Sequence, residues 1–191
     1  MTGNNVGTAA VADKAAEAEQ VRIVTVMSEQ LRARIDQLPV LIPPDHPLGK
    51  IQEKVVTLNR EAVVVEDQRF DGIVVTAPEA KASFAWAFAA PVNCASWYIL
   101  REKGDMKGFT NFLRQTRSQV PLAASMKPEG VENVTFQTLG NQSWSPKERY
   151  VIWFRFTDDR PVNVSIRAGF FARPSLSNNA VPSMLFPAPG K

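Results

Sequence analysis

The chain has 191 residues, of which 45% are hydrophobic and 21% are charged, with a formal net charge of +3. This balance is ordinary for a globular domain and excludes a disordered or fibrous chain. A single cysteine, Cys94, and a single histidine, His46, exclude a disulfide scaffold, a zinc ribbon and a Cys–His nucleophile pair.

The N-terminal segment, residues 1–49, is expected to comprise a loose arm, a helix and a proline-rich connector. The helix runs from about Ala12 to Leu38, because apolar residues in its second half recur on one helical stripe. That stripe consists of Val21, Val24, Leu31, Ile35 and Leu38. Its spacing also fits heptad positions over a stretch too short to predict a coiled coil. The helix follows a small, polar arm over residues 1–10.

A β-branched run over residues 21–27 leaves a strand open as the alternative to this part of the helix. Three prolines between residues 43 and 47 then exclude both a helix and a central strand. We therefore place a domain boundary at residue 49.

Residues 50–173 are expected to form an antiparallel β-sandwich, for which a jelly roll is one arrangement. Eight short segments have strand-like composition and are separated by turn-rich sequence, which favours a sandwich over alternating βα units. They are residues 52–58, 62–66, 72–76, 83–89, 95–101, 134–139, 150–156 and 162–171. One short helix, starting at Asp105 and ending before Pro121, is inserted between them. A proline-rich strap over residues 174–191 completes the chain.

The last two predicted strands show the clearest alternation of apolar and polar residues. Their apolar faces coincide if they form a hairpin with Phe156 opposite Val162 and Phe154 opposite Val164. This register requires a five-residue loop over 157–161, an accepted hairpin length.

The same register would bring Trp153, Arg155 and Arg167 together on the other face of the hairpin. An indole beside two guanidinium groups is suited to stacking on a sugar ring or holding an anionic group. These three residues are therefore the candidate ligand-binding platform, with a glycan or a polyanion as ligand. The alternative is that this face lies beneath a helix or against another subunit, because tryptophan is usually well buried.

Sequence motifs for catalysis are missing. The chain has no phosphate-binding loop and no G-x-S-x-G nucleophile elbow. We expect His46 to be solvated in its proline-rich loop and Cys94 to be a small buried hydrophobic residue. The sequence thus predicts no catalytic residue, no cofactor and no metal ligand. Paired carboxylates, which come together only in space, keep a small hydrolase open as a further interpretation.

The chain also shows no membrane or secretory signal. It lacks a run of about 20 apolar residues and a basic region followed by an apolar one. We therefore expect no membrane insertion, and a location in the cytoplasm or in an assembled particle by default. No specific nucleic-acid motif is present either.

Charge is divided unevenly along the chain. Residues 1–95 carry 9 basic and 12 acidic side chains, a balance of −3, and residues 96–191 carry 13 and 7, a balance of +6. This division is compatible with head-to-tail contacts between copies or with a polyanionic partner. Our leading hypothesis is a non-catalytic structural or assembly subunit that self-associates as a homo-oligomer or docks on a protein partner through its arm, strap and sheet surface. The alternative is a carbohydrate-binding module that uses the Trp/Arg platform.

Overall fold

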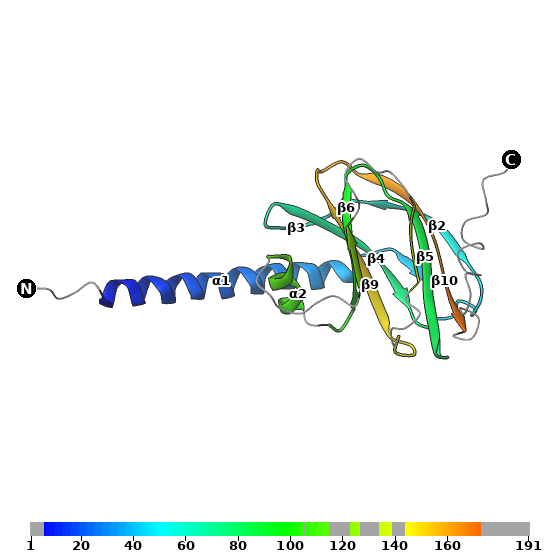
Figure 1. The fold of residues 1–191 in the computed structure, drawn as a ribbon, viewed down its shortest axis with the longest axis horizontal. Helices are drawn as coiled ribbons and strands as arrows, with labels where there is room; N and C mark the ends of the chain where they lie inside the picture. Colours follow the sequence, from blue (N-terminus) through cyan, green and yellow to red (C-terminus); the bar gives the residue numbers. More distant parts are fainter. Residues whose placement is uncertain (1–5, 105, 115–122, 127–133, 139–143, 173–191) are drawn as a thin grey trace, which may run out of the picture.

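The computed structural model describes residues 6–104, 106–114, 123–126, 134–138 and 144–172. Two β-sheets pack face to face, and both helices lie on the outer side of one of them (Figure 1). The prediction of a mainly β sandwich with an N-terminal helix and one inserted short helix is confirmed. The predicted strap, residues 174–191, lies outside the described residues.

The first sheet, sheet A, has the strand order β1-β4-β9-β6-β7, with β3 paired to β4. Its strands are β1 (Val40–Ile42), β3 (Val63–Val65), β4 (Gln68–Thr76), β6 (Cys94–Arg101), β7 (Ala123–Met126) and β9 (Arg149–Phe156). The β1–β4 pair is parallel and the other pairs are antiparallel. We did not predict β1 or β7, which are too short to show an alternating pattern. Strand β1 ties residues 40–42, which we had assigned to the N-terminal segment, into the sheet.

The second sheet, sheet B, has the strand order β2-β10-β5-β8, with every pair antiparallel. Its strands are β2 (Gln52–Leu58), β5 (Ala82–Ala89), β8 (Val134–Thr138) and β10 (Val162–Ala172). On the interior strand β5, the large side chains of Phe84, Trp86 and Phe88 alternate with alanines and all point into the core. The strand is therefore buried, as its composition suggests.

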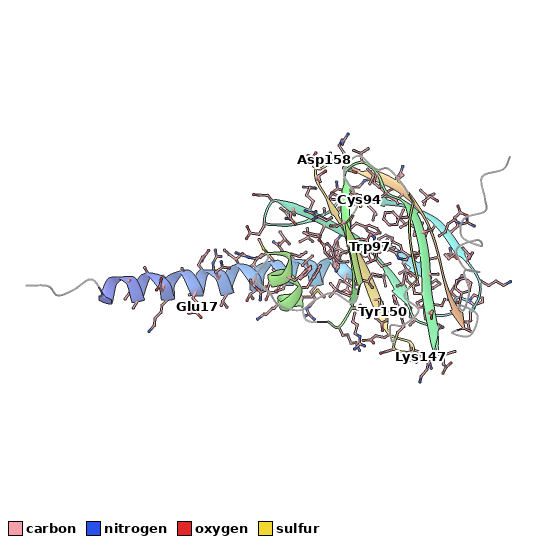
Figure 2. All side chains as sticks on the ribbon, viewed as in Figure 1. Glu17, Cys94, Trp97, Lys147, Tyr150 and Asp158 are labelled. Carbon is pink, nitrogen blue, oxygen red and sulfur yellow. The ribbon has the colours of Figure 1, made fainter. Side chains whose placement is uncertain are left out.

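The inner core lies between the two sheets and is rich in aromatic rings. Trp86 of sheet B meets Trp97 of sheet A edge to face, with ring centroids 4.9 Å apart. Phe88 and Phe154 make a similar contact across the sandwich at 5.4 Å. Figure 2 shows Trp97 and Tyr150 among the side chains of the sandwich. These contacts join the two sheets into one packed unit.

An outer core lies between sheet A and the helices α1 (Val6–Ile35) and α2 (Met106–Leu113). Leu31 and Ile35 of α1, together with Phe109 of α2, belong to the same apolar cluster as Trp153 of β9. Sheet A is thus buried on both faces, which explains why nearly every residue of β9 is buried.

The predicted hairpin between β9 and β10 is wrong. Strand β9 pairs with β4 and β6 in sheet A, whereas β10 pairs with β2 and β5 in sheet B. Residues 157–161 therefore cross from one sheet to the other. The apolar faces of β9 and β10 do face each other, but across the sandwich and not side by side. An alternating pattern sets which face of a strand is buried and leaves its hydrogen-bonded neighbour open.

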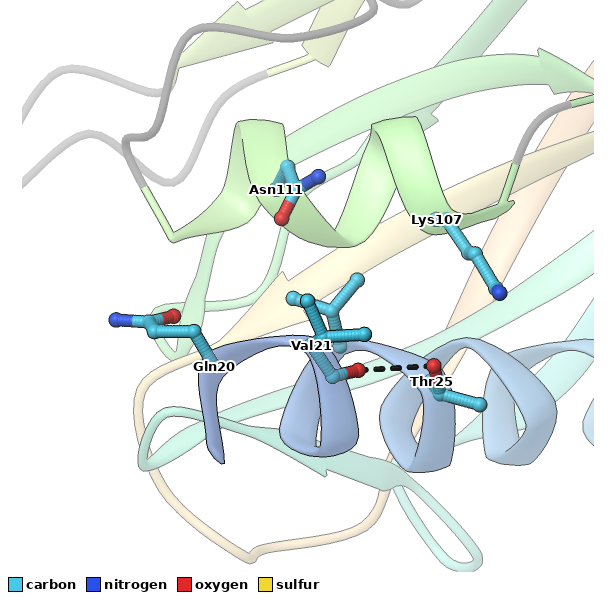
Figure 3. Close-up of a pocket in the computed structure, with 6 residues that line it drawn as sticks. Gln20, Val21, Thr25, Lys107 and Asn111 are labelled. Carbon is cyan, nitrogen blue, oxygen red and sulfur yellow. Dashed lines mark hydrogen bonds between the residues drawn. The ribbon is translucent and has the colours of Figure 1, made fainter. Parts of the chain in front are cut away.

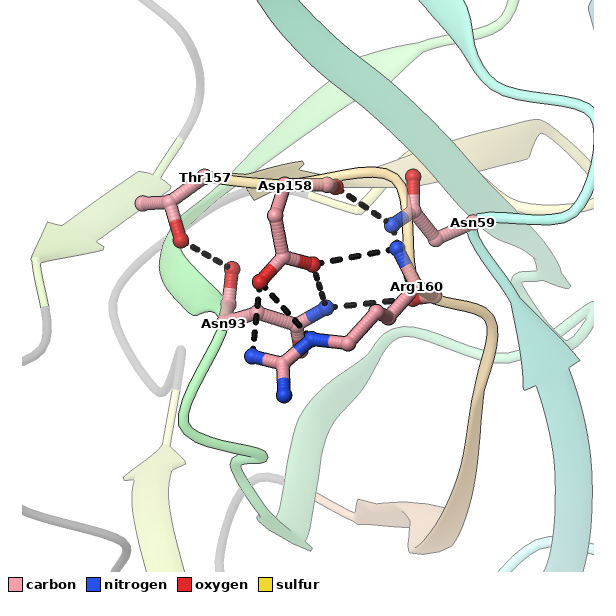
Figure 4. Close-up of polar contacts among 5 residues, drawn as sticks. All are labelled: Asn59, Asn93, Thr157, Asp158 and Arg160. Carbon is pink, nitrogen blue, oxygen red and sulfur yellow. Dashed lines mark hydrogen bonds and ion pairs between the residues drawn. The ribbon is translucent and has the colours of Figure 1, made fainter.

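Amide side chains hold the crossing loop in place (Figure 4). The Nδ2 atom of Asn59 donates hydrogen bonds to the carbonyl oxygens of Asp158 and Arg160, at 2.8 and 2.9 Å. Asn93 Nδ2 donates to Asp158 Oδ1 and also to the Arg160 carbonyl. These bonds provide donors for loop carbonyl groups that lie outside the hydrogen bonding of the two sheets.

Asp158 is the charged member of this loop. Hydrogen bonds from the Arg160 side chain, followed by that from Asn93, hold the pKa of the Asp158 carboxyl well below its usual range. A lowered pKa means that the charged form is favoured in the folded chain. The stabilisation it brings is therefore complete at neutral pH and is lost as the pH falls through the pKa of the folded state.

Candidate functional site

Helix α1 consists of an anchored part and a projecting part, and the projecting part extends well beyond the sandwich (Figure 1). Val24, Ser28, Leu31 and Ile35 are buried at the spacing of one helical face. Every residue from 9 to 22 is exposed. We call residues 9–22 the projecting segment.

The predicted N-terminal helix is confirmed, and it begins earlier than we expected. Residues 6–10, which we assigned to a loose arm, belong to the helix. Residues 21–27 are helical too, so the strand alternative for them is wrong. Alanine recurs throughout the first half of the helix and has the highest helix propensity of all residues. This part of the helix therefore forms without an apolar face packed on its own domain.

The exposed valines of α1 lie on two different faces of the helix. Val11 is 69% exposed and Val21 is 60% exposed, and Val26 in the next turn is 42% exposed. At about 100° per residue, Val11 and Val26 fall on one stripe with Ala15, Ala18 and Arg22. This stripe, which we call the free face, points away from the buried stripe of α1. Figure 2 shows Glu17 on the projecting segment, well away from the sandwich.

A shallow groove of about 360 Å³ lies between α1 and α2, where the projecting segment leaves the domain (Figure 3). Its lining residues are Gln20, Val21, Val24, Thr25, Lys107 and Asn111. The two valines supply apolar surface, whereas Lys107 and the amides supply polar groups. The Thr25 hydroxyl donates to the Val21 carbonyl at 2.8 Å and is used within the helix. Such a groove suits a side chain of another protein better than an enclosed small molecule.

A buried ion pair fastens the anchored part of α1 to sheet A. Arg34 Nη2 lies 3.1 Å from Oδ1 of Asp71, whose side chain is 1% exposed. The other oxygen of Asp71 accepts a hydrogen bond from the backbone N–H of Asn59 at 2.9 Å. Arg34 also pairs with Glu61 at 3.1 Å, and that carboxylate is 66% exposed. We did not predict this anchor, because nothing in the sequence connects residues 34 and 71.

The three residues of the predicted platform do not come together. Trp153 is fully buried in the outer core beneath the helices. Arg155, on the same side of sheet A, donates through Nε to Ser96 Oγ at 2.9 Å. Arg167 lies on β10 of sheet B, where its Nε is 3.6 Å from Glu53 Oε2.

The three residues therefore do not share one surface, as the platform hypothesis required. Trp153 and Arg155 lie on the outer face of sheet A, and Arg167 lies on the outer face of sheet B, on the opposite side of the sandwich. The cause is the mistaken hairpin register, which alone put these residues on one surface. The alternative that we left open, a face lying beneath a helix, describes Trp153.

The other residues considered for chemistry occupy structural positions. Cys94 is buried, as expected for a small hydrophobic residue. His46 Nε2 lies 2.9 Å from the carbonyl oxygen of Lys50, a contact that closes the turn after β1. Among the described residues, no group of three or more His, Cys, Asp or Glu side chains is placed to hold a metal ion.

The length and polarity of the helices bear on membrane insertion. Within the part of the chain that the structure describes, neither α1 nor α2 combines the length and the apolar character needed to span a bilayer.

Comparisons with known proteins give little further information. No family model matches the chain, and no curated protein matches it in sequence. Among solved structures, the chain is similar to PliG from Aeromonas hydrophila, a periplasmic lysozyme inhibitor of g-type lysozyme. The TM-score is 0.38 and the identity is 8%, over 69% of this chain and 97% of that one. A likeness of this size carries no argument about fold or function.

Proposed function

We propose that the protein is a non-catalytic assembly subunit that docks on another protein chain through the projecting segment of α1. The observation that carries this proposal is the contrast between the two parts of one helix. Val24, Ser28, Leu31 and Ile35 are buried, and residues 9–22 are all exposed. The sandwich thereby acts as a base that presents a helix to a partner.

The exposed valines support docking. Residues 9–22 are all exposed, and Gln20 and Val21 at the end of this segment line the groove beside α2, so burial within the chain contributes little to the ordering of the segment. An isolated helix of about 12–15 residues is only marginally stable in water. A partner helix or groove that covers Val11 and the alanines of the free face would stabilise the segment by removing apolar surface from water.

Two carboxylates that are hydrogen-bonded and ion-paired within the chain support the non-catalytic part of the proposal. Asp71 is occupied by Arg34 and by a backbone N–H, and Asp158 is occupied by Arg160 and Asn93. Both groups fasten loops and helices, and neither faces the groove beside α1.

Cross-linking in the cells that make the protein tests this function. A photoreactive amino acid in place of Ala18 should give one discrete product of higher mass, because Ala18 lies on the free face. The matched control is the same amino acid in place of Val55, which is 64% exposed on β2 of sheet B. Val11→Asp in the Ala18 chain should lower the yield several-fold. Equal products from positions 18 and 55, or none from position 18, would contradict the proposal.

A further inference from the structure

We draw no further inference here: the strongest candidate, the buried outer face of sheet B around Ser83, Ala85 and Phe171, carries nothing because no described part of the chain shows what covers it.

Discussion

Replacing Trp153 with alanine is expected to lower the free energy of unfolding by about 3–5 kcal/mol, the usual cost of removing a large buried side chain. Trp153 is fully buried in the outer core, together with residues of α1, α2 and β4. Its removal leaves a cavity in the layer that holds both helices on sheet A. Urea denaturation followed by circular dichroism measures the loss.

The neighbourhood of Trp153 shows how closely this layer is packed. Gly72 lies directly opposite Trp153 in the β4–β9 pair. A Cβ atom on Gly72 would come 2.7 Å from the carbonyl oxygen of Ile152 and 3.3 Å from the indole of Trp153. As a control, Trp153→Phe keeps most of the apolar volume and should lose less than half as much stability. A loss below about 1 kcal/mol for Trp153→Ala would show that the side chain is not part of the core.

Removing the buried carboxylate of the anchor should have an effect of similar size. Asp71→Ala leaves the largely buried Arg34 guanidinium without its buried charged partner, and leaves the N–H of Asn59 without an acceptor. Breaking a buried pair from one side costs about 3–5 kcal/mol. Chemical denaturation at neutral pH measures the change in the free energy of unfolding.

Glu61→Ala is the matched control, because it removes the other carboxylate of the same arginine. Glu61 is largely exposed, and an exposed pair contributes about 0–1 kcal/mol. Equal losses for Asp71→Ala and Glu61→Ala would mean that burial does not distinguish the two pairs. The anchored part of α1 would then depend on apolar contacts alone.

Sequence patterns were sufficient to predict most of the strands and the type of fold. Residues 162–171 alternate apolar and polar side chains along most of their length because one face of the strand is buried. Both this strand and residues 52–58 were predicted close to their true bounds. Strand β7, at residues 123–126, was missed because four residues are too few to show a period.

These patterns did not predict which strands pair with each other. The apolar residues of β9 and β10 face a common core whether the strands pair in one sheet or pack from two, so alternation cannot separate a hairpin from a crossover. The polar bonds that favour the crossover come from Asn59 and Asn93, which lie far from the loop in sequence. The Trp/Arg platform depended on that pairing and was lost with it.

The extent of α1 was also difficult to predict, for a different reason. The stripe of apolar residues predicted a helix from about Ala12, and the helical residues 6–10 were assigned to a loose arm. Residues 6–10 carry no such stripe, and their helical structure follows from the propensity of alanine. A polar arm and a projecting helix therefore look alike when only hydrophobic periodicity is considered.

Amide hydrogen exchange along α1 tests the two-part helix most directly. In a dilute monomeric sample, the amides of residues 9–22 should exchange at least about 100-fold faster than those of residues 24–35, because only the latter are held by the outer core. Their exchange should slow once a partner chain covers them. Equal protection of the two parts in the dilute monomer would contradict the account, since residues 9–22 would then be packed on their own chain and unable to present a docking surface.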